Sequence, residues 1–498
     1  MKNQIYTCQK TMSFTRLLLP LLMAALLSSC ANFSGISSEK HITELSGKQD
    51  VKSLPFEHGN WPASDWANQF GDQQLSELIA EALKSNPSLD EARARVAAAS
   101  AFSEEARANT LPKVGADYSL TRQQYSKSAL IPPPYAGSWT TENKAVLGAS
   151  YDLDLWGKNS QALSASVSKL WATEAEGEQV KLSLSLSIAS VYNELARLYA
   201  LRDLAQEEVQ QWQGISRISE HRVASGLDTE VERQTAISKL AASKAALTAL
   251  DGQMFDTRYQ LGALLGQGPD RGLSIRRPVL SIGDVVLLPD QLPADLVARR
   301  PDIVAARWRV DVTTHDIKSA KADFYPNINL SAAIGLDAFG FGRFLSAASG
   351  TVTAGPAIHL PIFDSGALRA SLKVSYADFD LAVANYNRTL VTALSDVATQ
   401  LSRIRSNDAQ QVDAQAAAHA ADRAFQLATS QYQAGLITQL AVYQARVIAL
   451  SSEQNVINLR MNRRTQQIVL AAALGGGFID THNVVLNAAS NSQPRHAQ

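Results

Sequence analysis

The two cysteines and eight histidines of this 498-residue sequence are its most obvious candidates for nucleophiles, bases and metal ligands. The histidines are scattered. There is no Gly-x-x-x-x-Gly-Lys phosphate loop, no His-Glu-x-x-His zinc pair and no Gly-x-Ser-x-Gly nucleophile elbow. The 46 basic and 47 acidic residues nearly cancel, so no field of one sign favours nucleic acid. We therefore expect no catalytic residue, metal or cofactor, and no nucleic-acid partner.

Cys30 is the residue for which the sequence indicates a covalent modification. A basic stretch precedes the apolar run 17–27, a pattern typical of a secretory signal peptide. This run is shorter than the roughly 20 apolar residues that a transmembrane helix needs. Residues 27–30 read Leu-Ser-Ser-Cys and resemble the bacterial lipobox, in which the cysteine thiol receives a diacylglycerol and becomes the mature N-terminus. We predict that residues 1–29 are removed and that Cys30 begins a lipidated tether over 30–59.

The residues around the predicted cleavage site also indicate where the mature chain resides. Cleavage removes Cys8 and leaves Cys30 acylated, so neither a disulfide nor a cysteine-bound metal is expected. An Asp after such a cysteine usually signals retention in the inner membrane, and here that residue is Ala31, which points to the outer membrane. No later stretch contains 18 uninterrupted apolar residues, so a membrane crossing would have to use strands.

Four segments alternate apolar and polar residues with period two, which predicts strands with one apolar and one polar face. Their length of about ten residues matches the pattern of outer-membrane barrel strands. Pro356 and Pro361 weaken the last prediction, because proline cannot complete a sheet ladder. The predicted strands cover about 113–122, 145–155, 327–337 and 351–362.

Two long stretches without proline predict pairs of long helices. The first helix would be roughly 100 Å long at 1.5 Å per residue, so we expect it to run along a coiled coil or a tube. Gly226 and Gly435 mark the breaks within the pairs, because glycine adopts the left-handed conformation that ends a helix. Asp228 is expected to cap the helix that follows Gly226. The predicted helices cover about 159–224, 228–265, 365–434 and 438–474.

The same order of predicted helices and strands occurs twice in the sequence. A shift of 214 residues places Pro87 on Pro301 and Pro112 on Pro326, and a shift of 209 places Gly226 on Gly435. The chain is therefore predicted to consist of two tandem repeats, each with long helices and a β-hairpin. The predicted boundaries are a first repeat over 60–268, a linker over 269–293, a second repeat over 294–478 and a flexible tail over 479–498.

Four strands per chain cannot close a barrel. Open edges in lipid cost several kcal/mol for each unpaired backbone group, so copies of the chain should associate until the sheet closes. Two copies would give a barrel nearly filled by side chains, whereas three give twelve strands and a lumen. The predicted fold class is mainly α with a transmembrane β portion: a trimeric twelve-stranded outer-membrane barrel continued by a periplasmic α-helical barrel.

Residues 60–478 resemble the TolC-like outer-membrane efflux factors, in the lipoprotein branch that works with multidrug pumps. The most specific motifs are Ala-Arg-Arg-Pro-Asp-Ile-Val-Ala-Ala at 298–306 and Ala-Lys-Ala-Asp-Phe-Tyr-Pro-Asn-Ile at 320–328. The resemblance implies a homotrimer in outer-membrane lipids, a periplasmic adaptor (membrane fusion protein) and an inner-membrane efflux transporter. It also implies a passive exit duct for drugs or other small toxic compounds.

In this family the adaptor docks at the helix-turn-helix tips, which carry a glycine followed by an apolar residue. The matching positions are Val223, Ala224, Gly226 and Leu227 in the first repeat, and Ala434, Gly435 and Leu436 in the second. Each glycine also serves simply to permit a turn, and both roles are compatible. Some members close the periplasmic mouth with acidic residues where this chain has Ala441 and Gln444, so an acidic, cation-binding gate is not expected here.

Two alternatives remain open. The duct could export proteins or metal ions, although the five methionines of the chain weaken a copper or silver relay. The chain could also be a non-conducting structural lipoprotein of the envelope. The four alternating segments argue against that alternative, because a spacer has no need of lipid-facing strands.

Overall fold

The computed structural model describes residues 33–43, 60–128, 131–281 and 292–482. Cys30, the predicted signal peptide 1–29 and parts of the predicted tether, linker and tail lie outside these ranges. Two compact units are present: unit 1 comprises 1–42, 97–172 and 306–386, and unit 2 comprises 43–96, 173–305 and 387–498. In the described part of the chain, no helix is both long enough and apolar enough to span a membrane.

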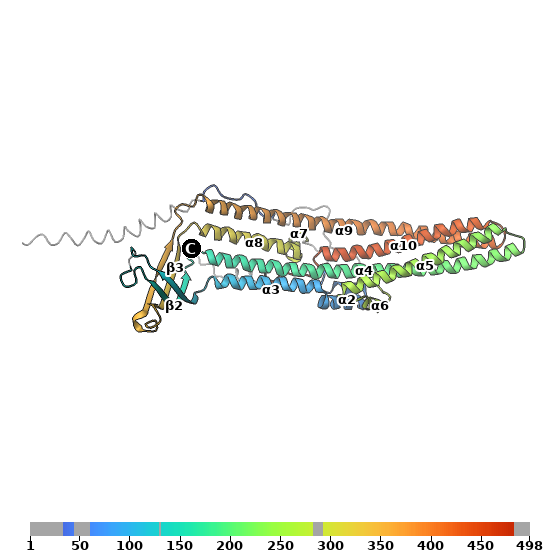
Figure 1. The fold of residues 1–498 in the computed structure, drawn as a ribbon. Helices are drawn as coiled ribbons and strands as arrows, with labels where there is room; N and C mark the ends of the chain where they lie inside the picture. Colours follow the sequence, from blue (N-terminus) through green and yellow to red (C-terminus); the bar gives the residue numbers. More distant parts are fainter. Residues whose placement is uncertain (1–32, 44–59, 129–130, 282–291, 483–498) are drawn as a thin grey trace, which may run out of the picture. The chain divides into compact units, whose positions relative to one another are not determined.

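Unit 1 contains one antiparallel sheet of four strands in the order β1-β2-β3-β4 (Figure 1). The pairing of β2 with β3 joins the hairpin of the first repeat to that of the second. The strands are β1 (Lys113–Gln124), β2 (Trp139–Asp152), β3 (Asn327–Phe339) and β4 (Gly350–His359).

Two strand predictions differ from the structure at their ends. β2 covers 139–152 rather than 145–155, because Trp139 and the polar residues after it pair with the end of β1, up to Gln124 opposite Trp139. It stops before Asp154, whose carboxylate instead accepts hydrogen bonds from the backbone N–H groups of Asn159 and Ser160, at 2.9 and 2.7 Å. β4 ends at His359, two residues before Pro361. Pro356 is tolerated because β4 is an edge strand of this sheet.

The duplication is visible in the helix lengths. α4 (Lys158–Ala224) and α9 (Ala367–Gln433) each have 67 residues, and α5 (Glu230–Leu264) and α10 (Gln439–Ala473) each have 35. Pro87 and Pro301 each open the helix that follows a break, where the missing N–H is not needed. The other elements are η1 (Trp66–Phe70), α2 (Gln73–Ser85), α3 (Pro87–Ala108), α6 (Pro269–Leu273), α7 (Leu292–Arg299), α8 (Pro301–Ala322) and η2 (Ala347–Ser349).

Parts of the predicted linker and tail are ordered. Residues 269–273 form α6, and α7 already begins at Leu292. The first residues of the predicted flexible tail bind the body of unit 2: the Asp480 N–H donates to the Ala298 carbonyl at 3.3 Å, and His482 Nε2 lies 2.8 Å from Glu174 Oε2. These contacts are long-range and leave no periodic pattern in the sequence.

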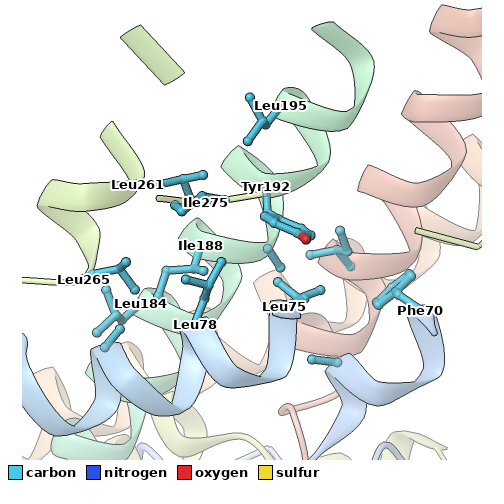
Figure 2. Packing of buried hydrophobic residues seen from close by; sticks show 14 of the residues in the cluster. Phe70, Leu75, Leu78, Leu184, Ile188, Tyr192, Leu195, Leu261, Leu265 and Ile275 are labelled. Atoms are coloured by element: carbon cyan, nitrogen blue, oxygen red, sulfur yellow. The ribbon is translucent and has the colours of Figure 1, made fainter. Parts of the chain in front are cut away.

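The main apolar core of unit 2 lies between α2, α4, α5 and the end of α10. Figure 2 shows Leu75 and Leu78 of α2 pointing toward Ile188 of α4, with Leu261 of α5 beside them. Each such side chain contributes roughly 1.5–3 kcal/mol when fully buried. The core also holds one polar group, because the Tyr192 hydroxyl donates to Asp72 Oδ2 at 2.7 Å and accepts from Gln74 Nε2 at 2.6 Å.

Candidate functional site

The sheet of unit 1 has one apolar and one polar face. The strand register places Ala116, Leu147, Ile334 and Val352 in one row across all four strands. These side chains are not covered by other parts of unit 1: Ile334 is 58% exposed and Val352 77% exposed. On the opposite face the register aligns polar residues such as Ser119, Lys144 and Asp337. A contiguous exposed apolar face of this kind marks a surface that meets a lipid or protein environment.

Both edges of the sheet are open. Within the described residues, β1 pairs only with β2 and β4 pairs only with β3. The outward backbone groups of β1 and β4 therefore have no strand partner among the residues that the structure describes. In an apolar medium each unpaired group costs several kcal/mol, so the sheet needs further strands at both edges.

The two helical hairpins of unit 2 end in the same turn. At the end of α4, the Leu227 N–H donates to the Arg222 carbonyl at 2.8 Å and the Gly226 N–H to the Val223 carbonyl at 3.0 Å. The end of α9 has the same pair of hydrogen bonds, donated by the backbone N–H groups of Leu436 and Gly435, both at 2.9 Å. This is the Schellman motif, in which a residue with positive φ ends the helix. Gly226 has φ +70° and Gly435 has φ +77°.

The predicted tip residues lie at these two turns. Leu227 is 65% exposed and Leu436 75% exposed, although both are large apolar side chains. A Cβ atom added to Gly226 or Gly435 would meet nothing within 4 Å. Glycine is therefore required at these positions by the backbone conformation and not by crowding. The remaining predicted residues Val223, Ala224 and Ala434 lie at the helix ends beside them.

A polar cluster that the sequence did not predict joins the two tips. We call Arg222, Asp228 and Tyr432 the tip cluster. Asp228 accepts hydrogen bonds from Arg222 Nε at 2.9 Å and Nη2 at 3.1 Å, and from the Tyr432 hydroxyl at 2.7 Å. The Arg222 guanidinium lies 4.8 Å from the centre of the Tyr432 ring. The side chain of Asp228 is only 12% exposed, and the hydrogen bond from Arg222 lowers its pKa.

The role of Asp228 differs from the prediction. It does not cap α5; Thr229 does, because its side chain accepts from the Val231 N–H while Glu232 accepts from the Thr229 N–H. One feature of the sequence indicates where the tip cluster forms. Under the shift of 209 residues, Arg222 corresponds to Gln431 and Asp228 to Ile437, so the two repeats differ where the cluster forms.

An apolar cluster packs the hairpins together next to the tip cluster. The rings of Trp212 on α4 and Tyr443 on α10 lie 4.9 Å apart. Burial raises the pKa of the Tyr443 hydroxyl. The full cluster contains Trp212, Ile215, Phe425, Tyr432, Val442, Tyr443 and Ala449. The two tips are therefore held as one packed surface.

Replacing Asp228 with Asn is expected to loosen the two tips. The charged, bidentate partner of the largely covered Arg222 is replaced by a neutral amide, at a cost of about 1.5–3 kcal/mol. Because the pKa of Asp228 is lowered in the folded chain, its contribution is present at neutral pH and is lost as the pH falls through that lowered value. The rate of backbone amide hydrogen exchange in residues 223–229 and 430–437 measures how firmly the two tips are held. Identical exchange in the wild type and the variant at pH 7 would show that the cluster does not hold the tips.

Two further sequence predictions concern the lipidated cysteine and the missing acidic gate. Cys30 lies outside the described residues. Ala441 and Gln444 lie in the first turns of α10, with no carboxylate of their own. Over the described ranges, no three His, Cys, Asp or Glu side chains are gathered as metal ligands.

An amphipathic sheet with open edges, combined with paired helices of 67 and 35 residues, is the arrangement expected of an outer-membrane duct protein. The sequence matches the family model described as "Outer membrane efflux protein" over residues 78–267 and 292–476. The chain belongs to this family. The prediction of an outer-membrane efflux duct, and not an enzyme, is thereby confirmed.

Individual relatives agree with this assignment. The chain is 40% identical to the fusaric acid resistance protein FusA of Burkholderia cepacia over 322 residues, a match that covers 64% of this chain and 60% of FusA. It is 31% identical to the multidrug resistance outer membrane protein MdtP of Escherichia coli K12 over 430 residues, covering 84% of this chain and 87% of MdtP. The crystal structure of the outer membrane protein VceC from Vibrio cholerae aligns with a TM-score of 0.79 at 35% identity, covering 84% of this chain and 100% of that chain.

Proposed function

We propose that the chain is the outer-membrane duct of a tripartite efflux system and passes drug-type small molecules to the exterior. The support for the substrate class comes from its relatives: MdtP is named for multidrug resistance and FusA for fusaric acid resistance. Fusaric acid is therefore the first compound to test. The duct is passive, and an inner-membrane transporter supplies the energy through a periplasmic adaptor.

The observation that carries this proposal is the sheet with one exposed apolar face and two open edges. Three copies supply twelve strands, so that β4 of one copy pairs with β1 of the next and no edge remains in lipid. The apolar face then meets the acyl chains and the polar face lines a wet lumen. The long helices of the three copies continue this barrel as a helical tube in the periplasm.

The tips are proposed as the adaptor-docking surface. Leu227 and Leu436 offer apolar side chains to a partner, and the space around Gly226 and Gly435 is open to it. The exposed leucines lie beside glycine turns, on two hairpins that the tip cluster holds together. Such a surface can bind the tip of another helical hairpin through apolar contacts.

Cys30 is proposed to carry the lipid that anchors the mature chain to the outer membrane. The support is the sequence at 27–30 and the apolar run before it. Mass spectrometry of the mature N-terminus tests this, since an acyl mass on Cys30 is expected and a free thiol would contradict it.

The duct is tested by purification and by transport. Detergent-purified protein is expected to have the mass of a trimer by light scattering and to conduct ions in planar bilayers. Cells that lack the protein are expected to become several-fold more sensitive to drugs such as fusaric acid, and the cloned gene to restore resistance. A monomer that never conducts would refute the proposal.

A further inference from the structure

The segment Phe33–Ser38, which follows the proposed lipidation site, is packed into unit 1. Ile36 is buried in an apolar cluster with Ile317 of α8, with Phe324 in the turn that follows α8, and with Leu372 of α9. Phe33 packs against the same cluster, and its ring lies edge-on to that of Phe324 at 5.8 Å between centroids. Figure 1 shows this stretch as a dark blue trace beside the start of α9. Within the lipidated tether predicted over 30–59, this stretch is therefore packed against unit 1.

Polar contacts hold both ends of this segment. At its start, Lys321 Nζ lies 5.5 Å from the centre of the Phe33 ring, and Arg369 Nη2 donates to the Ser34 carbonyl at 3.1 Å. At its end, the Ser38 hydroxyl donates to Asp380 Oδ1. These partners lie on both α8 and α9, so the segment bridges the two helices.

The docking position lies where the helices meet the sheet. Phe324 is three residues before the start of β3 at Asn327, and Arg369 lies in the first turn of α9. Cys30 is three residues before Phe33. An extended chain spans at most about 3.6 Å per residue, so three residues give a lipid on Cys30 a reach of about 11 Å from Phe33. A lipid on Cys30 is thus tied closely to the end of the membrane-facing sheet.

We propose that Phe33–Ser38 is a clasp that seats the N-terminal lipid at the junction of strands and helices, so that its acyl chains enter the bilayer beside the apolar face of the same subunit's sheet. The clasp rests on the proposed lipidation of Cys30. A short tether keeps the sheet at a high effective concentration at the membrane surface, and this concentration falls roughly as the −3/2 power of tether length. Because the clasp keeps the tether short, the lipid speeds insertion of the strands into the membrane.

Lengthening the tether tests the positioning. A 12-residue Gly-Ser insertion between Asn32 and Phe33 extends the tether about fivefold and is expected to slow membrane insertion about tenfold. The same insertion between Lys40 and His41, on the C-terminal side of the clasp, is the matched control and is expected to stay within about twofold of the wild type. The readout is the rate at which newly made protein becomes resistant to urea extraction from membranes. Equal rates for the two insertions would overturn the proposal.

A second variant tests the docking itself. Phe33→Ala with Ile36→Ala removes the apolar contacts and is expected to speed tryptic cleavage after Lys40 at least about tenfold in the purified full chain. Ser37→Ala with Glu39→Ala is the control with unchanged cleavage. Unchanged cleavage in Phe33→Ala/Ile36→Ala, with a lipid found on Cys30, overturns the clasp alone. A free Cys30 thiol overturns the lipidation and the positioning role together, while efflux measurements judge the duct separately.

Discussion

Ile334→Arg is expected to leave most of the protein outside the membrane, whereas Ala333→Arg, one residue earlier on β3, is expected to insert nearly as well as the wild type. Ile334 belongs to the exposed apolar face, in register with Leu147 and Val352, and Ala333 belongs to the opposite face, in register with Gly148 and Thr353. An arginine at the lipid-facing midplane of a barrel costs roughly 2–4 kcal/mol, and in a trimer this cost arises three times. A lumen-facing arginine stays in water.

The measurement is the fraction of each variant that resists extraction of membranes with urea. Because about 1.4 kcal/mol is a factor of ten, Ile334→Arg is expected to lower this fraction by at least about tenfold. The two variants share a strand, a substitution and nearly the same depth, so general loss of β structure affects both. Equal loss in both variants would mean that the apolar face does not meet lipid.

Replacing Gly226 and Gly435 together by Asn is expected to impair export while trimers still form. Asn tolerates the left-handed conformation of these positions, so the turn is kept. Its side chain enters the open space beside Leu227 and Leu436, where the adaptor is proposed to dock. Misfit at the centre of a docking surface costs about 1–3 kcal/mol, so we expect drug resistance to fall on the order of tenfold.

Gly252→Asn provides the matched control for the tips. Gly252 lies within α5 and its Cβ position is also open, but it is far along the helix from the turn. This variant is expected to export normally. Gly226→Leu with Gly435→Leu should impair export further, because each adds about 1–2 kcal/mol of left-handed backbone strain. Normal export by the Asn double variant would argue against docking at the tips.

Local sequence patterns were sufficient to predict the helices and strands of this fold. Alternation with period two located β1 and β3 and the apolar residues of one face, because each strand exposes alternate side chains to opposite sides. Gly226 and Gly435 located the two turns, because few other residues adopt positive φ. The start of β2 at Trp139 was missed, since the residues after Trp139 are polar and owe their strand conformation to pairing with β1.

The amino-acid sequence by itself determined the two repeats, the four amphipathic strands, the long helices and the family. Strands and helices follow from residues close together in the chain, and the repeats and the family follow from comparing such local motifs. Only the tertiary structure decided that Asp228 binds Arg222 and Tyr432 rather than capping α5, and that Phe33–Ser38 is packed against α8 and α9. Tyr432 is 204 residues from Asp228, and Asp380 is 342 from Ser38. Contacts over such separations form when folding brings distant segments together, and they leave no period in the sequence from which to predict them.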